Sequence, residues 1–225
     1  MEQFLPMMQN TSIFAGMSKD EIRAILHCLD ARRMHYAKGG YILRAGSGTE
    51  AMGLVLTGKV LVIQEDIWGR RSIMDMLAQG EFFGEPFAAS PGSVLNVSVV
   101  ADSDCEVLML NINRILSTCP TACAHHTQVV RNLVATLARK ALRFNNKITH
   151  MSKRTTREKL LSYLSAESIR QGSLSFTIAY DRQQLADYLC VERAAMSVAL
   201  SALQRDGLIT YKKNRFTLHA GVGEA

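Results

Sequence analysis

The sequence has no apolar run of about 18 residues, the length that a membrane-spanning helix needs, so we expect no transmembrane segment. Its first residues, Met1 to Phe4, carry neither the basic region nor the apolar stretch of a secretory signal. Five cysteines are an odd number, and without an export signal they argue against a disulfide framework. These absences predict a cytoplasmic protein.

Familiar catalytic patterns are missing as well. We find no P-loop, no GxSxG, no HExxH and no pair of carboxylates in a recognisable frame. Hydrophobic residues make up 48% of the 225 residues, which is typical of a folded globular protein. We therefore expect a binding protein rather than an enzyme, with enough chain for one large domain or two small ones.

Basic residues are in excess, mostly toward the end of the chain. The formal net charge is +6. Residues 152–225 hold 11 Lys and Arg against 7 Asp and Glu, a net of +4, whereas the longer segment 1–151 holds 15 against 13, a net of +2. A positive C-terminal part suits a polyanionic partner.

Short strands are predicted from about residue 36 to residue 112. The segments are rich in β-branched and aliphatic residues and are separated by Gly and Asp, a pattern typical of a sandwich or barrel. Their ranges are 41–43, 53–66, 72–77, 96–101 and 105–111. A helix is predicted before them, over 18–29, where Ser18 and Glu21 have the spacing of a capping box.

From about residue 121 the periodicity becomes helical. Apolar residues alternate at spacings of four and three over three heptads, a narrow stripe roughly 30 Å long. The stripe consists of Val130, Val134, Leu137, Ala141, Phe144, Ile148 and Met151. It favours a parallel homodimer, and the alternative is a core helix packed on the barrel. A polar hinge follows near Ser152, with Thr155 or Thr156 as a cap for the next helix.

Two short helices are predicted around a break at residues 189–191. Asp181 and Gln184 form a capping box for the first helix. In the second helix, Met196 and Leu200 begin an apolar face, and Arg193, Ala194, Ser197, Val198 and Ser201 lie opposite. This pattern predicts a helix-turn-helix. Cys190 occupies the turn position where such proteins often have Gly, so we expect a turn without a positive φ.

A basic hairpin is predicted directly after these helices. Its strands are expected over 208–211 and 216–219, and its tip carries Lys212, Lys213, Asn214 and Arg215. A hairpin beside a helix-turn-helix is typical of a DNA-binding winged helix, in which the second helix enters the major groove and the wing meets phosphates. The alternative for the tip is a solvated run of charges.

The succession of barrel, long helix and winged helix resembles the cyclic-AMP receptor/FNR (Crp/Fnr) family of bacterial transcription regulators. The resemblance covers nearly the whole chain. The segments that carry it are KGGYILRAG (38–46), GLVLTGKV (53–60), GEFFGE (80–85) and RQQLADYLCVERAAMSVALSALQRDGLI (182–209). The family has an effector-sensing domain, a dimerisation helix and a DNA domain whose orientation the effector sets.

The resemblance implies an α+β fold in three parts. These are a cyclic-nucleotide-binding-like β jelly-roll barrel over 1–120, the dimerisation helix over 121–151 and the winged helix-turn-helix over 152–225. It further implies a homodimer on an inverted-repeat DNA operator, with RNA polymerase as a partner. The competing prediction is a cyclic-nucleotide-binding signalling module, such as the regulatory part of a kinase or channel, which shares the barrel but lacks the winged helix.

Residues of the DNA domain receive roles from the same resemblance. The residues expected to contact bases are Arg193, Ala194, Ser197 and Val198. The residues expected to contact phosphates are Arg182, Gln183, Lys212, Lys213 and Arg215. Arg193 suits a bidentate contact with guanine. Well-known members have Glu in place of Ala194 and Arg in place of Val198, so their operator is not expected to transfer.

The barrel departs from the cyclic-AMP pattern of the family. Gly84 and Glu85 are retained, but Leu95 and Asn96 stand where cyclic-AMP binders have an Arg-Ser pair that holds the phosphate, and the Thr-Ser pair of the dimer helix is absent. A buried phosphate needs a cation or several N–H donors. Cyclic AMP is therefore disfavoured as the effector. The candidate effector pocket consists of Gly84, Glu85, Leu95 and Asn96. Without cyclic AMP, Gly84 and Glu85 are interpreted as a turn with a local hydrogen bond at a barrel edge.

Other cofactors of the family need particular ligand residues. The FNR-type iron–sulfur cluster is disfavoured because the first 30 residues contain only Cys28. Cys119, Cys123 and His126 lie near an expected helix start and form a candidate site for a metal, a haem or a redox switch. The alternative is that the two cysteines are small packing residues and the histidine is a surface residue.

Overall fold

The computed structural model describes residues 1–116 and 124–219. The chain divides into two compact units, Met1–Ala141 and Leu142–Ala225. The division falls inside the long helix α5, Ala124–Met151, ten residues before the predicted hinge. The first part of this helix therefore belongs to the first unit and its last turns belong to the second unit.

Short helices precede the sheets of the first unit. They are η1 (Glu2–Phe4), α1 (Leu5–Gln9) and α2 (Lys19–Cys28). The predicted capping box of α2 is confirmed: the backbone N–H of Glu21 donates to Ser18 Oγ at 3.3 Å, and the N–H of Ser18 donates to Glu21 Oε2 at 2.7 Å. The buried face of α2, which includes Ile22 and Ile25, joins the main apolar core.

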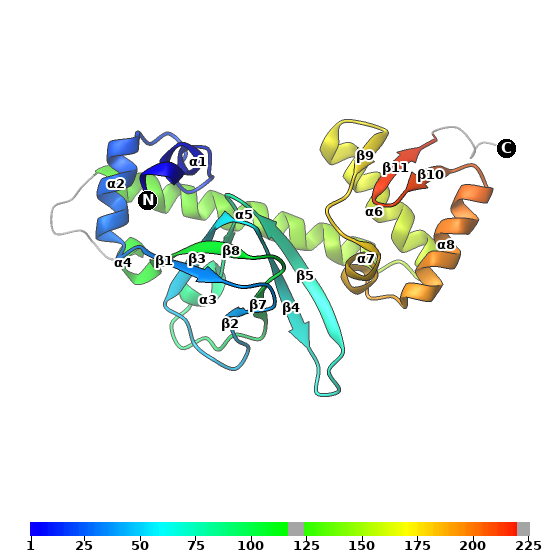
Figure 1. Ribbon diagram of the computed structural model, residues 1–225, viewed down its shortest axis with the longest axis horizontal. Coiled ribbons are helices and arrows are strands. Elements are labelled where there is room, and N and C mark those ends of the chain that lie inside the picture. The colour runs from blue at the N-terminus through cyan, green and yellow to red at the C-terminus, as the bar shows by residue number, and fades with distance from the viewer. Residues whose placement is uncertain (117–123, 220–225) are drawn as a thin grey trace. The chain divides into compact units, whose positions relative to one another are not determined.

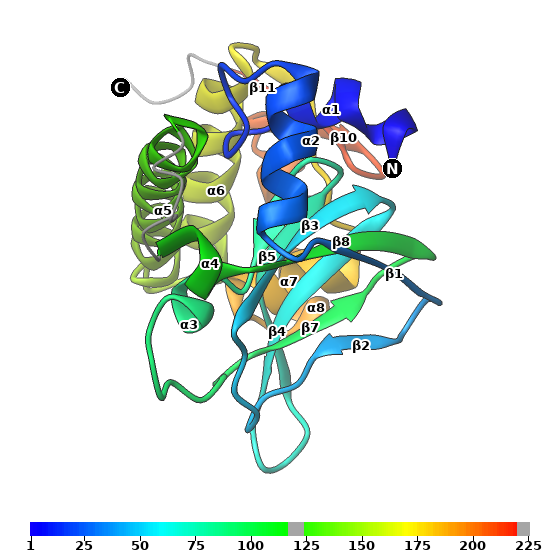
Figure 2. The same ribbon diagram turned by 90° about the vertical axis from the view of Figure 1, so that its left-hand side faces the viewer.

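Two antiparallel four-stranded sheets form the jelly roll (Figures 1 and 2). One sheet has the order β1 (Arg32–Tyr36), β8 (Cys105–Asn111), β3 (Ala51–Thr57) and β6 (Phe82–Phe83). The other has the order β2 (Tyr41–Leu43), β7 (Ser98–Ala101), β4 (Lys59–Glu65) and β5 (Arg71–Ala78). The short helices α3 (Glu85–Ala88) and α4 (Ile112–Leu116) complete the unit. The barrel-type fold that the sequence predicts is confirmed.

The strand boundaries differ from the prediction at one glycine. The segment 53–66 was predicted as one strand, whereas the structure breaks it into β3 and β4 at Gly58, which has a φ of +77°. A Cβ atom there would lie 2.5 Å from the carbonyl oxygen of Asp104, so this tight passage excludes a side chain. Strand β1 was not predicted, because its residues are almost all exposed and lack the alternating pattern.

The first half of α5 packs on the jelly roll through Val129 and Leu133, which are buried in the main core. The predicted apolar stripe lies one residue further along the helix and presents a different face. Val134 is 62% exposed, whereas Val130 and Leu137 are partly buried against the core. The helix therefore has a barrel-packing face and, beside it, an apolar face that this chain leaves largely open.

The β4–β5 hairpin extends to a tip that is ordered by one aspartate (Figure 1). Asp66 Oδ1 accepts hydrogen bonds from the backbone N–H groups of Trp68 and Arg70, each at 2.9 Å. Gly69 adopts a φ of +77° in this turn. The tip exposes Ile67 and Trp68, whose exposed fractions are 89% and 76%.

The second unit contains three helices and a small sheet after the last turns of α5. The helices are α6 (Thr156–Gln171), α7 (Arg182–Leu189) and α8 (Arg193–Arg205). The sheet has the order β10 (Ile209–Lys212), β11 (Arg215–Leu218) and β9 (Ser175–Thr177). The caps that the sequence predicts at Thr155 and Asp181 are both confirmed as capping boxes.

The end of α5 is anchored in this second unit by two buried polar residues. Lys147 Nζ lies 4.6 Å from the ring centre of Tyr188. His150 Nδ1 is 2.8 Å from Ser162 Oγ, and its imidazole packs edge-on against the Tyr163 ring at 5.9 Å. The last turns of the helix are thus part of the core around α6 and α7.

Candidate nucleic-acid interface and effector region

The turn between α7 and α8 is sharp and left-handed. Cys190 ends α7 with φ 51° and ψ 56°. The expectation of a turn without positive φ was therefore wrong: this turn needs the left-handed conformation, and a cysteine adopts it in place of glycine. The N–H of Cys190 donates to the carbonyl of Asp187, and the N–H of Val191 donates to that of Ala186, so these bonds close the end of α7, and α8 begins at Arg193.

Helix α8 separates its two faces as the sequence predicts. Met196, Leu200 and Leu203 are buried in the unit. The opposite side is exposed and carries Arg193, Ala194, Ser197 and Val198. Val198 is 71% exposed, and Ser197 Oγ donates to the carbonyl of Arg193 at 3.0 Å. Arg193 is the first residue of the helix and is exposed.

The wing is a β-hairpin with a two-residue turn, Lys213 and Asn214, and it is supported by a third strand. β10 and β11 pair from Ile209 with Leu218 to Lys212 with Arg215, and β9, which was not predicted, flanks β11. Lys212, Lys213 and Arg215 are all exposed. Across the part of the chain that the structure describes, none of these three side chains has a hydrogen-bond or ion-pair partner.

Two of the predicted phosphate residues have partners within the unit. Gln183 Nε2 donates to Asp187 Oδ1 at 2.8 Å. Arg182 is only partly exposed, and its Nη2 donates to the carbonyl oxygen of Lys213 at 2.7 Å. Burial lowers the pKa of the Arg182 guanidinium, and neighbouring Tyr211 opposes the shift. The structure therefore separates Arg182 from the freely exposed cations of the wing tip.

In the first unit, Glu85 is fully buried, and its side chain bonds to the distant Lys140, whereas the sequence suggested a local hydrogen bond at a barrel edge. Its carboxylate forms an ion pair with Lys140 of α5, with Nζ 2.8 Å from Oε1. The same Nζ donates to Oε2 at 3.0 Å and to the carbonyl oxygen of Phe82. Gly84 precedes it with a φ of +81°, which directs the Glu85 side chain inward from the start of α3. Sequence reasoning missed Lys140 because only the fold brings it to Glu85.

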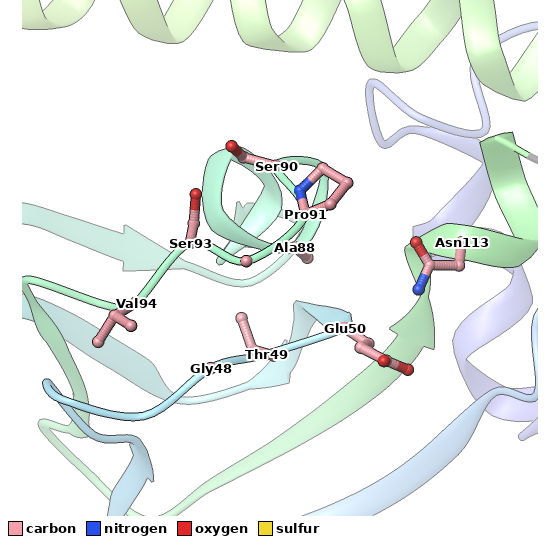
Figure 3. A pocket seen from close by; sticks show the side chains of 10 residues that line it. Gly48, Thr49, Glu50, Ala88, Ser90, Pro91, Ser93, Val94 and Asn113 are labelled. Carbon is pink, nitrogen blue, oxygen red and sulfur yellow. The ribbon is translucent and has the colours of Figure 1, made fainter.

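The other two residues of the predicted effector region, Leu95 and Asn96, differ in their burial. Leu95 is 2% exposed, and its backbone bonds to Gly46 and Ser47, whereas Asn96 is exposed. A hollow of about 520 Å³ lies nearby, between residues 48–50 and 88–94, with Asn113 at one end (Figure 3). None of the four predicted effector residues lines this hollow.

The predicted metal or haem site falls mainly outside the described residues. Cys119 and Cys123 both lie outside them. His126 is half-buried and has an interaction partner. Within residues 1–116 and 124–219, no three His, Cys, Asp or Glu side chains gather closely enough to hold a metal ion. Over the same ranges, no helix combines the length and hydropathy that crossing a bilayer requires.

Comparisons with known proteins agree with this architecture. The "Cyclic nucleotide-binding domain" family matches residues 33–121, and the "Crp-like helix-turn-helix domain" family matches residues 158–220. The chain is 27% identical over 202 residues to the cyclic AMP receptor protein of Thermus thermophilus, covering 90% of this chain and 89% of that protein.

Solved structures share the fold at lower identity. FixK2 from Bradyrhizobium japonicum has a TM-score of 0.65 at 21% identity, with 84% of this chain and 92% of that chain covered. The c-di-GMP-responsive regulator CLP from Xanthomonas campestris has a TM-score of 0.72 at 18% identity, with 91% and 100% covered.

A jelly roll followed by a winged helix with an exposed recognition face defines a DNA-binding transcriptional regulator. More particularly, the chain belongs to the Crp/Fnr family. The competing prediction of a signalling module without a DNA domain does not account for residues 158–220.

Proposed function

We propose that the protein binds an inverted-repeat operator as a homodimer. We further propose that an effector other than cyclic AMP controls this binding by acting on the first unit, Met1–Ala141, which we call the sensing unit. The observation that carries the proposal is the exposed row Arg193, Ala194, Ser197 and Val198 on a helix whose opposite face is fully packed. Such a helix lies in the major groove, and two copies reach half-sites about one helical turn apart.

We expect residues of α8 to recognise the base sequence and residues of the wing to provide affinity for the DNA backbone. The Arg193 guanidinium matches the two acceptors of a guanine edge, while the side chains of Ala194 and Val198 match the methyl group of thymine. Lys212, Lys213 and Arg215 bind phosphates without regard to sequence, because their ammonium and guanidinium groups have no partners within the described chain. The half-site is therefore expected to contain a guanine and to be richer in A·T than the half-sites of members with Glu and Arg at these places.

The dimer is supported by apolar surface along α5. Three residues of the predicted stripe are substantially exposed in the second unit: Phe144 at 38%, Ile148 at 64% and Met151 at 37%. With Val134 they follow the heptad spacing that a two-stranded coiled coil buries. Pairing of two such helices removes the apolar side chains from water and places two copies of α8 in one complex.

Control by the sensing unit is supported by the ion pair between Glu85 and Lys140. It joins the start of α3 to the helix that carries the apolar stripe. A ligand or chemical change that favours one arrangement of this helix shifts the population that is competent for DNA. Cyclic AMP is a poor candidate because Leu95 is buried and uncharged where a phosphate-binding Arg is needed. Promoter-bound dimers would then act through RNA polymerase.

The test is an operator selection with the full chain. Purified protein is incubated with a random duplex library at low salt, and recovered sequences are expected to form an inverted repeat. Light scattering of the same sample is expected to give twice the 24.9 kDa chain mass. A single-chain mass together with no enriched sequence would overturn the proposal, and an enriched single half-site would overturn the dimeric part of it.

A further inference from the structure

Arg182, the first residue of α7, extends across the wing. Its guanidinium carbon lies 4.7 Å from the ring centre of Tyr211 and 5.3 Å from that of Phe216. Nη2 donates to the carbonyl oxygen of Lys213 at 2.7 Å, and Nη1 is buried without a hydrogen-bond acceptor among the described residues. Nη1 and one N–H of Nη2 are therefore committed to the inside of the unit.

The rings beneath this arginine form a continuous stack through the wing. Tyr211 of β10 stacks on Phe216 of β11 with centroids 5.7 Å apart, and Phe216 stacks on Phe176 of β9 at 6.3 Å. Phe216 has no exposed surface. Arg182 lies against two of these rings, Tyr211 and Phe216, and links them to the first helix of the helix-turn-helix. The ring faces also account for buried Nη1, because an aromatic face attracts a guanidinium N–H.

The carbonyl that accepts the hydrogen bond from Arg182 belongs to Lys213, a residue with a left-handed backbone conformation. Lys213 has a φ of +54°, which is uncommon for a residue with a side chain and persists only where its surroundings enforce it. The other half of the loop is fixed from the opposite side. Asn214 Nδ2 donates to the carbonyl of Ile178 at 3.1 Å, and the N–H of Ile178 donates to the carbonyl of Asn214 at 2.9 Å.

We propose that Arg182 is a positioning residue for DNA binding: it sets the direction of the wing tip by holding the Lys213 carbonyl and does not itself bind a phosphate. The proposal rests on the proposed function, in which the wing cations bind phosphates. Three of the five N–H groups of the guanidinium are unavailable to a phosphate, because both on Nη1 are buried and one on Nη2 donates to the Lys213 carbonyl. Arginine is required here because only a planar guanidinium can stack on a ring and donate sideways at the same time.

The experiment compares Arg182→Lys, Arg182→Gln, Lys213→Ala and the double variant R182K/K213A on the selected operator, with affinity measured across a range of salt concentrations. On B-DNA the slope of log affinity against log salt falls by about 0.9 for each phosphate that the protein no longer neutralises. Arg170→Lys is the matched control, since the Arg170 side chain pairs with Glu167 of the same helix, α6.

We expect R182K, although it keeps the charge, to lower the salt slope at least as much as K213A does. R182Q should behave like R182K. The double variant should show no further loss, because Lys213 is already misplaced when Arg182 is changed. The operator-to-random-DNA discrimination should stay near that of the wild type, and R170K should change neither quantity. A wild-type salt slope for R182K, or losses that add in the double variant, would overturn the proposal, since both indicate a direct phosphate contact.

Amide hydrogen exchange without DNA separates this role from general destabilisation. The Ile178 N–H, which donates to the Asn214 carbonyl, should exchange faster in R182K while the amides of buried α8 turns keep their rates. Equal acceleration at all amides would overturn the positioning role. If the wild-type protein binds no DNA, the proposed function fails, and the exchange at Ile178 alone decides whether Arg182 holds the tip.

Discussion

The ammonium group of Lys140 contacts both carboxylate oxygens of Glu85, at 2.8 Å and 3.0 Å. The acid has no exposed surface, and the Lys140 side chain is only 15% exposed. A buried pair of this kind adds little net stability over apolar residues of similar size, but removal of one partner is costly. We expect the pair to fix the register of α5 against the start of α3 more strictly than an apolar contact would.

The first prediction concerns this pair. Lys140→Met should lower the free energy of unfolding by about 3–5 kcal/mol, because it leaves the Glu85 carboxylate buried and unpaired. The double variant E85Q/K140M should recover much of the loss. Urea denaturation followed by circular dichroism measures both. Arg131→Met, at an exposed position on the same helix, should change stability by less than about 0.5 kcal/mol; an equal loss there would contradict a specific role for the pair.

The second prediction is a pH dependence at the end of α5. Burial lowers the pKa of His150 below its ordinary value of 6.5; Glu167 opposes the shift, and Lys153 adds to it. The unfolded chain therefore takes up a proton at a higher pH than the folded chain. The contribution of His150 to stability should be complete above the unfolded pKa and decline as the pH falls below it. His150→Gln should remove this slope in urea melts between about pH 7.5 and 5. An unchanged slope would assign it to other groups.

The third prediction tests the open face of α5. Ile148→Glu should convert the dimer to a single chain, since a charge inside an apolar seam is not compensated. Its effect on the fold should be small because Ile148 is 64% exposed. Light scattering gives the mass, and circular dichroism gives the helix content. Asn146→Glu, exposed but outside the stripe, should remain dimeric; dissociation of both variants would argue against this seam.

The fourth prediction separates reading from affinity. Arg193→Ala should reduce discrimination at one base pair of each half-site by roughly 1–3 kcal/mol. Lys212→Ala should instead weaken binding to all sequences and flatten the salt dependence by about 0.9 for each phosphate left without its cation. Fluorescence anisotropy with operator and single-base variants distinguishes the two. Equal losses on every sequence for R193A would remove Arg193 from base reading.

The fifth prediction concerns the turn at Cys190. Its φ of 51° is one that glycine adopts freely, so Cys190→Gly should raise thermal stability, by up to about 1 kcal/mol. Cys190→Val should lower it, because β-branched residues adopt positive φ poorly. The thermal midpoints of the two variants should therefore lie on opposite sides of the wild-type value. A lower midpoint for C190G would mean that the interactions of the thiol outweigh the backbone strain.

Local signals predicted much of this fold. The capping boxes at Ser18, Thr155 and Asp181 depend on residues three positions apart, and all three are present in the structure. The same holds for the two faces of α8, because helical periodicity alone separates Met196 from Ser197. Strand β6, by contrast, has only two residues, too few to show a period.

Long-range contacts were not predictable. Lys140 and Glu85 are 55 residues apart, and nothing in either segment points to the other. The same applies to Arg182, which lies 31 residues before the carbonyl that it holds. The resemblance to the family suggested a phosphate contact at that position, yet the aromatic residues Tyr211 and Phe216 lie beneath it. Such residues acquire their roles from tertiary packing, which periodicity does not encode.

The β4–β5 hairpin has a practical consequence. Trp68 is the only tryptophan of the chain, and it stands at the hairpin tip with most of its indole in water. Its emission in the native protein should already resemble that of a solvated indole, so denaturation will shift the spectrum little. Any macromolecule that covers this hairpin should instead move the maximum to shorter wavelength. The native protein thus carries an internal optical reporter of docking at one defined point.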